Sequence, residues 1–137
     1  MKTKKTSLSE QKQQLHRSTF HVHNVDNGVI VFQFEALSRE VLIPFIDYVR
    51  AMKIKSPVRI MFDFRGAGAP SRYIIDRLPQ VLGEIKFPED TRIGFVNDDM
   101  MTTRFVRKML DDLPEGVGEL REFINYDPAM HWLEDGT

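Results

Sequence analysis

Residues 58–64, VRIMFDF, decide the fold of this chain, because they read as a strand with no solvated face. A strand with one wet face alternates apolar and polar side chains, whereas a strand covered on both sides is apolar along most of its length. Here five of the seven residues are apolar. We therefore predict that this stretch is the central strand of a sheet that is covered on both sides.

Four more strands are predicted around this one. Residues 29–34, VIVFQF, are rich in β-branched and aromatic side chains, which favour strands. They follow a half-exposed strand at 20–25 after Asp26-Asn27-Gly28, residue types that accept the positive φ of a tight hairpin turn. Further strands are predicted at 91–97 and 119–124. The first two strands should therefore form an N-terminal β-hairpin.

Apolar residues at helical spacing fill the segments between these strands. Ser38 is the predicted N-cap of the first helix. Thr102 or Thr103 is predicted to cap the third, and Asp127 the fourth, with Pro128 as its first helical residue. The predicted helical patterns run over 41–52, 74–85, 105–113 and 129–133.

Prolines interrupt two of these helical patterns, Pro44 the first and Pro79 the second. We expect each proline to kink its helix or to delay its start. A groove left between these helices could be lined by Phe45, Tyr48 and Tyr73, although ordinary core packing is the interpretation that we favour for these three side chains.

The resulting order is hairpin, helix, strand, helix, strand, helix, strand, helix. Such alternation predicts a mostly parallel sheet with right-handed crossovers, and the hairpin adds one antiparallel strand. We predict a single α/β domain over 19–137, with a mixed, mostly parallel sheet of about five strands and about four helices. Residues 1–18, rich in Lys, Gln and Ser, are predicted to be a mobile N-terminal arm.

Composition and charge narrow the function classes. Apolar residues make up 42% and charged residues 28% of the chain, as in ordinary soluble domains. The formal net charge of −1 provides no long-range field, so we expect no nucleic-acid partner. Cysteine is absent, which excludes disulfides, a thiolate nucleophile and cysteine-bound zinc. No apolar run is long enough to cross a bilayer, so we expect no integral membrane segment and a cytoplasmic location. We also expect no cofactor.

The loop after the central strand, RGAGAPSR, is the first candidate site. Its glycines would let the backbone approach a ligand, and the helix N-terminus that follows could hold an anion. The candidate ligand-binding residues are Arg65, Gly66, Gly68, Ser71 and Arg72. The loop lacks the third glycine of the dinucleotide fingerprint and the lysine of the Walker motif. We favour the alternative of a plain strand-to-helix turn with Ser71 near the helix cap.

Three aspartates form the second candidate site. Asp63 lies near the end of the central strand, and Asp98 and Asp99 follow the next strand. The carboxyl ends of parallel strands meet at one edge of the sheet, where open α/β folds bind ligands. Three carboxylates at this edge could hold Mg²⁺ for phosphotransfer, although Asp98 and Asp99 also suit a capped turn before a helix.

The C-terminal third resembles a known family. The strand RIGFVND (92–98), a helix, a strand ending near Phe123 and the stretch DPAMHWL (127–133) are similar to the tail of SpoIIAA-like proteins, which are related to the STAS domains of anti-sigma-factor antagonists. The resemblance implies a mixed sheet with helices packed on it. It also implies a role in binding or regulation and no chemistry.

In the STAS antagonists that this resemblance points to, a serine directly after an aspartate is phosphorylated by a partner kinase. Here Asp63 is followed by Phe64-Arg65-Gly66, and Ser71 comes several residues later. The chain departs from the family pattern at this point, so the resemblance alone does not make Ser71 a phosphorylation site.

Three hypotheses for the function follow from these residues. The first is a non-enzymatic regulatory or binding module that acts through protein partners or a small apolar or anionic ligand. The alternative is a metal-assisted phosphotransfer or hydrolase enzyme that uses the three aspartates. The third is a self-association domain, a homodimer that pairs through the hairpin edge. We favour the first because no complete catalytic constellation is visible in the sequence.

Overall fold

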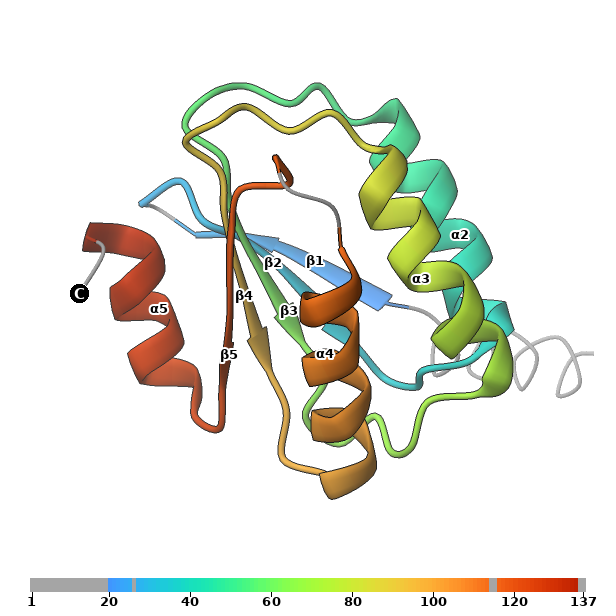
Figure 1. Cartoon of the computed structure of the whole chain (residues 1–137). Helices are drawn as coiled ribbons and strands as arrows, with labels where there is room; N and C mark the ends of the chain where they lie inside the picture. Colours follow the sequence, from blue (N-terminus) through green and yellow to red (C-terminus); the bar gives the residue numbers. More distant parts are fainter. Residues whose placement is uncertain (1–19, 26, 114–115, 136–137) are drawn as a thin grey trace, which may run out of the picture.

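The structure, a computed structural model, describes residues 20–25, 27–113 and 116–135 (Figure 1). The predicted arm at 1–18 lies outside the described residues, as does Asp26 of the predicted hairpin turn. The elements are β1 (Phe20–Asn24), β2 (Ile30–Phe34), α2 (Arg39–Ala51), β3 (Arg59–Asp63), α3 (Arg72–Glu84), β4 (Arg92–Val96), α4 (Met100–Asp112), β5 (Glu119–Phe123) and α5 (Tyr126–Asp135). This architecture, an α/β fold with an N-terminal hairpin, confirms the predicted fold class.

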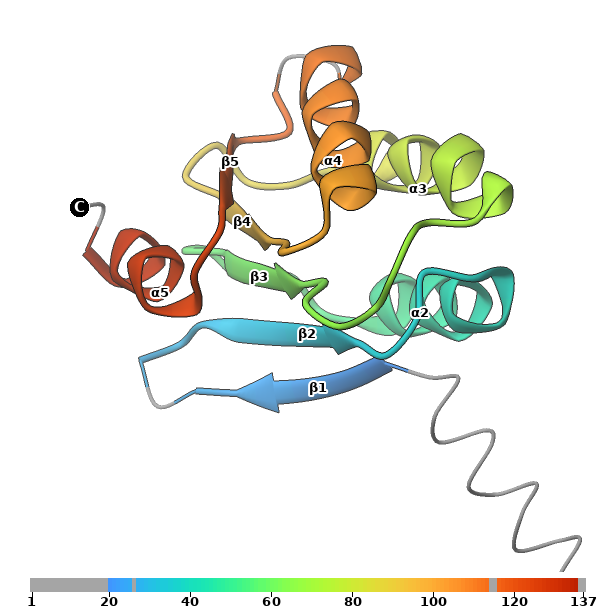
Figure 2. The same cartoon turned by 90° about the horizontal axis from the view of Figure 1, so that it is seen from below.

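The five strands lie in the sheet in the order in which they occur in the chain, β1-β2-β3-β4-β5. β1 pairs with β2 in antiparallel fashion, and the other neighbours are parallel. From β2 to β5, each crossover leads to the next strand on the same side of the previous one. Crossovers of this kind that are all right-handed must pass over the same face of the sheet. Accordingly α2, α3 and α4 cover one face, and α5 lies alone on the other (Figures 1 and 2).

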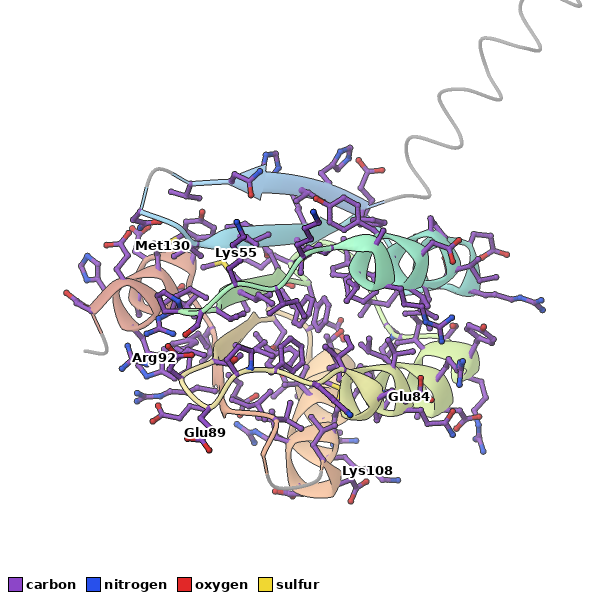
Figure 3. The ribbon with its side chains drawn as sticks, turned by 90° about the horizontal axis from the view of Figure 1, so that it is seen from above. Lys55, Glu84, Glu89, Arg92, Lys108 and Met130 are labelled. Atoms are coloured by element: carbon purple, nitrogen blue, oxygen red, sulfur yellow. The ribbon has the colours of Figure 1, made fainter. Side chains whose placement is uncertain are left out.

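Two apolar clusters hold these layers together. The three-helix face carries a core rich in phenylalanine, made of Phe32, Phe34, Phe45, Phe62, Phe64 and Phe95 together with the aliphatic faces of α2, α3 and α4. The α5 face carries a smaller cluster, made of Val29, Val31, Met61, Val96, Ala129, Met130, Trp132 and Leu133. Figure 3 shows Met130 and Arg92 on the α5 side, away from the three-helix core. The central strand β3 therefore packs against helices on both faces, as its sequence predicts.

α4 begins earlier than predicted, because its N-cap is Asp99 and neither threonine. The Oδ1 atom of Asp99 accepts hydrogen bonds from the backbone amides of Met101 (2.8 Å) and Thr102 (3.2 Å). A carboxylate at this position also complements the positive end of the helix dipole, which a threonine hydroxyl does not. The side chains of Thr102 and Thr103 instead donate to the backbone oxygens of Gly68 and Asp99.

α5 also begins earlier than predicted, at Tyr126, so Asp127 lies in its first turn and is not its N-cap. Pro128 is tolerated there, since the first amides of a helix have no partner within it. Pro44 and Pro79 lie inside α2 and α3. Of the two effects expected from Pro44, the delayed start is absent, because α2 begins at Arg39, directly after its N-cap Ser38.

Candidate functional site

The candidate site lies at the carboxyl edge of the four parallel strands, at the bottom of Figure 1. The segments that lead from β3 to α3, from β4 to α4 and from β5 to α5 meet there. This is the edge at which open α/β folds place their ligands. Two neighbouring hollows mark it. Asn125 and Pro128 line both of them.

The first hollow is built around Arg65. Asp63, the last residue of β3, is buried on the α5 face with only 3% exposure. Its two carboxylate oxygens accept from Nε and Nη2 of Arg65, both at 2.9 Å. This paired geometry is the strong, orientation-specific form of a carboxylate–guanidinium contact. The hydrogen bonds that Arg65 donates to Asp63 raise the pKa of Arg65, so the side chain stays charged and fixed in orientation.

The ring of Tyr126 also contacts the guanidinium of Arg65. Cζ of Arg65 lies 5.1 Å from the centre of the Tyr126 ring, within the range of a cation–π contact. Burial raises the pKa of Tyr126, and the negative charge of Asp63 adds to the rise. The hollow itself is shallow and open, and Asn125 and Asp127 line it beside these two residues. Its chemistry is therefore mixed, with one cation and one anion exposed to the same space.

The second hollow is a cleft of about 430 Å³ between α4 and β5. Asn97, which directly follows β4 and is 2% exposed, donates from Nδ2 to Oγ1 of Thr103 at 2.6 Å. Glu122 of β5 accepts from Nε of Arg107 on α4. Within the described part of the chain, two buried oxygens here have no hydrogen-bond partner, Oδ1 of Asn97 and Oε2 of Glu122.

The glycine loop connects β3 to α3. Gly66 and Gly68 have φ of +74° and +77°, a region that side chains with a Cβ rarely adopt. Ser71 is the N-cap of α3, and its Oγ accepts from the amide of Ile74 at 3.4 Å. Arg72 pairs with Asp76 on α3. Arg65 faces α5, whereas Ser71 and Arg72 belong to a helix on the opposite face, so the five predicted residues do not converge on one ligand.

The three predicted aspartates are each engaged in a local contact. Asp63 pairs with Arg65, and Asp99 caps α4. Asp98 is exposed, and its Oδ1 lies 3.5 Å from the amide of Gly66. Among the residues that the structure describes, no group of three or more His, Cys, Asp or Glu side chains is arranged to hold a metal ion. The metal-assisted alternative stays a prediction that no geometry in this part of the chain favours.

The groove predicted beside the two prolines is only partly present. Phe45 is fully buried in the core, and Tyr73 lies beneath the guanidinium of Arg39. Tyr48 packs edge-on against core rings and keeps a partly exposed face. Pro79 does line a hollow, but between α3 and α4. Core packing therefore accounts for Phe45, as favoured above.

Comparisons of the chain with models of protein families, with curated proteins and with solved structures found no match. The resemblance to SpoIIAA-like proteins accordingly stays a prediction. In the described residues, none of the helices has the length and apolar character that a membrane crossing requires.

Proposed function

We propose that this chain is a non-enzymatic binding module that holds a protein partner at the carboxyl edge of its sheet. One observation carries the proposal: large apolar side chains stand exposed around this edge. Met100 is 72% exposed and Met101 56% at the start of α4, and Ile124 is 76% exposed just after β5. Ile124 lines the same cleft as Thr103, which lies two residues beyond Met101. Exposed apolar groups rimmed by polar ones are typical of protein-binding surfaces.

The chemistry of the edge supports binding over catalysis. The hydroxyl of Ser71 is used as a helix cap, the carboxylate of Asp63 is neutralised by Arg65, and Asp99 is used as a cap. A nucleophile needs a base within hydrogen-bonding reach, and Ser71 has a backbone amide there instead. Ser71, Asp63 and Asp99 thus each have a structural task.

The shape of the edge favours a protein over a small molecule. Small-ligand sites are usually concave pockets that enclose most of the ligand and are lined mainly by apolar groups. The hollow beside Arg65 is instead shallow, and its lining includes Asn125 and Asp127. A broad partner surface can cover both hollows and the exposed methionines together, whereas a small ligand would occupy one of them.

Site-specific photocross-linking in cells that express the chain tests the proposal. A photoreactive amino acid replaces Ile124 or Met101 in the full chain, and the matched control replaces Ile43, an isoleucine of α2 that is 42% exposed and lines neither hollow. We expect one discrete adduct with a second protein from positions 124 and 101 and none from 43. Adducts of equal yield from all three positions, or none from the edge, would contradict the proposal, and adducts of the chain with itself would favour the homodimer.

A further inference from the structure

The cleft between α4 and β5 is lined by two residues that each carry a buried acceptor without a donor. Oδ1 of Asn97 and Oε2 of Glu122 are both buried, and neither has a partner among the described residues. A buried acceptor that lacks a donor destabilises the folded chain. Two such atoms in one hollow indicate that the hollow is built for a group that donates hydrogen bonds.

The orientation of the Asn97 amide is fixed by its neighbours. The hydroxyl of Thr103 donates to the backbone oxygen of Asp99 at 2.9 Å. That hydroxyl must therefore act as an acceptor toward Asn97, and the atom facing it has to be Nδ2, at 2.6 Å. Turning the amide over would place two oxygens together with no hydrogen between them. Oδ1 is consequently the atom left without a donor.

The two acceptors lie on the same side of the sheet. Glu122 is the register partner of Phe95, and Asn97 lies two residues beyond Phe95 on the neighbouring strand. Residues two apart along a strand share a face, so Asn97 and Glu122 are diagonal neighbours facing α4. Side chains at diagonal positions are close enough for one small group to contact both.

The charge of the surroundings favours a cationic donor. Glu122 is paired with Arg107, whereas Asp98, Asp99 and Asp127 of the same edge have no ion-pair partner in the described part of the chain. Arg104 of α4, also without an ion pair there, offsets part of this charge. The remaining excess of carboxylates would repel an anion and attract an amine.

The guanidinium of Arg107 already contacts one of the two residues, Glu122. Its Nε donates to Oε1 of Glu122, while its side chain is 69% exposed. Ion pairs with one exposed partner are weak and exchange readily with solvent. The guanidinium thus shows that the carboxylate accepts a cation, and it can swing outward when another cation arrives.

We propose that this cleft binds an alkylammonium group, whose three N–H donors match Oδ1 of Asn97 and the carboxylate of Glu122. The alkyl chain would lie against the apolar lining, which includes Phe123, Ile124 and Pro128. The inference rests on the proposed function in one respect: a lysine side chain of the protein partner is the source of the group. The inference goes beyond the proposed function because it names the chemical group, a lysine ammonium, by which the partner is recognised.

The test is a titration of the isotope-labelled full chain with n-butylamine, followed by NMR of the backbone amides at neutral pH and constant ionic strength. Butylamine is protonated under these conditions, since alkylamines have a pKa near 10. We expect saturable shifts at Asn97, Thr103 and Glu122, and none with butanol, which has the same length without the charge. Glu122→Gln should weaken binding about tenfold, because it removes the charge but keeps the shape.

Two further variants make the result decisive. Glu119→Gln is the matched control, because Glu119 is an exposed residue of the same strand outside the cleft, and it should leave the affinity unchanged. Arg107→Ala should strengthen binding, because it removes the internal cation, and it remains informative if Glu122→Gln fails to fold. Equal shifts with butanol, unchanged affinity in Glu122→Gln or weaker binding in Arg107→Ala would overturn the inference. Because no partner is needed, these outcomes are independent of the cross-linking result.

Discussion

The two faces of the sheet differ in how completely helices cover them. α2, α3 and α4 seal one face over a core of phenylalanine rings, whereas α5 lies alone on the other face and contacts mainly β3, β4 and β5. On the face of α5, His21, Gln33 and Asp63 lie in one row that runs from the open hairpin to the covered strand β3, since these three are register partners across β1, β2 and β3. Polar groups therefore gather where the helical cover is incomplete.

Two members of this row pair with polar side chains beside it. Nε2 of His21 lies 2.7 Å from Oε1 of Glu35, and Nε2 of His23 lies 3.4 Å from Oε1 of Gln33. On the sealed face, polar side chains appear at the edge by β5, where Asn97 and Glu122 face α4. The comparison teaches that the sealed face supplies stability and that the margins of helical cover supply the candidate binding groups.

The sharpest way to break this comparison uses two consecutive residues of β3 that point to opposite faces. Phe62 contacts the rings of Phe32, Phe45 and Phe95 in the sealed core, and Met61 packs under α5. We expect Phe62→Ala to lower the free energy of unfolding by about 3–5 kcal/mol and Met61→Ala by less, from the lower part of a range of about 2–5 kcal/mol, because Phe62 leaves the larger cavity and lies in the larger cluster. Urea denaturation of both variants measures the difference. Equal losses would mean that the two faces stabilise the fold alike.

A smaller effect is expected from the arginine at the margin of the α5 face. Arg65→Met leaves the buried carboxylate of Asp63 without its side-chain partner, and the backbone amide of Arg65 at 3.1 Å remains. We expect a loss of about 1–3 kcal/mol in the free energy of unfolding. The control is Arg72→Met, which removes an exposed ion pair within α3 and should cost only about 0.3–0.5 kcal/mol.

Thermal and urea unfolding of these two variants decide between a structural pair and a surface pair. If both methionine variants lose the same small amount, Asp63 does not depend on Arg65, and the guanidinium is a surface group like any other. A large loss in Arg65→Met alone would place the pair among the contacts that hold the α5 face together.

Most of the fold could be predicted from the sequence because the strands and helices carry strong patterns. The uniformly apolar β3 and the alternation of elements together predict the sheet and its covering helices. Helix starts are harder to predict, since Asp99 and Thr102 both suit a cap and only the folded geometry shows which of them meets free amides. The sequence does not reveal the first turn of α5, because any early helical position tolerates a proline and Pro128 therefore does not mark the first residue.

The candidate site could be predicted only in part. Asp63 and Arg65 were visible at the end of the central strand, but Tyr126 joins them through the docking of α5, which depends on tertiary contacts. The position of Glu122 could be predicted, because it shares a strand face with Leu120 and is therefore an acidic side chain directed toward the helices. That Glu122 lies near Asn97 could not be predicted, because this depends on the register between β4 and β5.

The smallest expected effect on the free energy of unfolding comes from Tyr126, and it occurs at high pH. Burial raises the pKa of its phenol, with the charge of Asp63 adding to the rise. A raised pKa in the folded state means that folding favours the protonated phenol. The stability it contributes is therefore complete below the unfolded pKa of about 10 and is lost as pH rises from there through the folded value.

Tyr126→Phe should remove this part of the alkaline loss, because phenylalanine has no proton to release. Urea unfolding at a series of pH values between about 8 and 11 measures it, and ultraviolet absorbance of the tyrosinates should show the latest-titrating phenol missing from the variant. Tyr48→Phe is the matched control, since Tyr48 lies on the sealed face beside Phe32. If Tyr48→Phe changes the alkaline profile and Tyr126→Phe does not, the phenol at the margin is as well solvated as a free tyrosine. The α5 face would then have no desolvated group at its open end, and the contrast between the two faces would be one of packing alone.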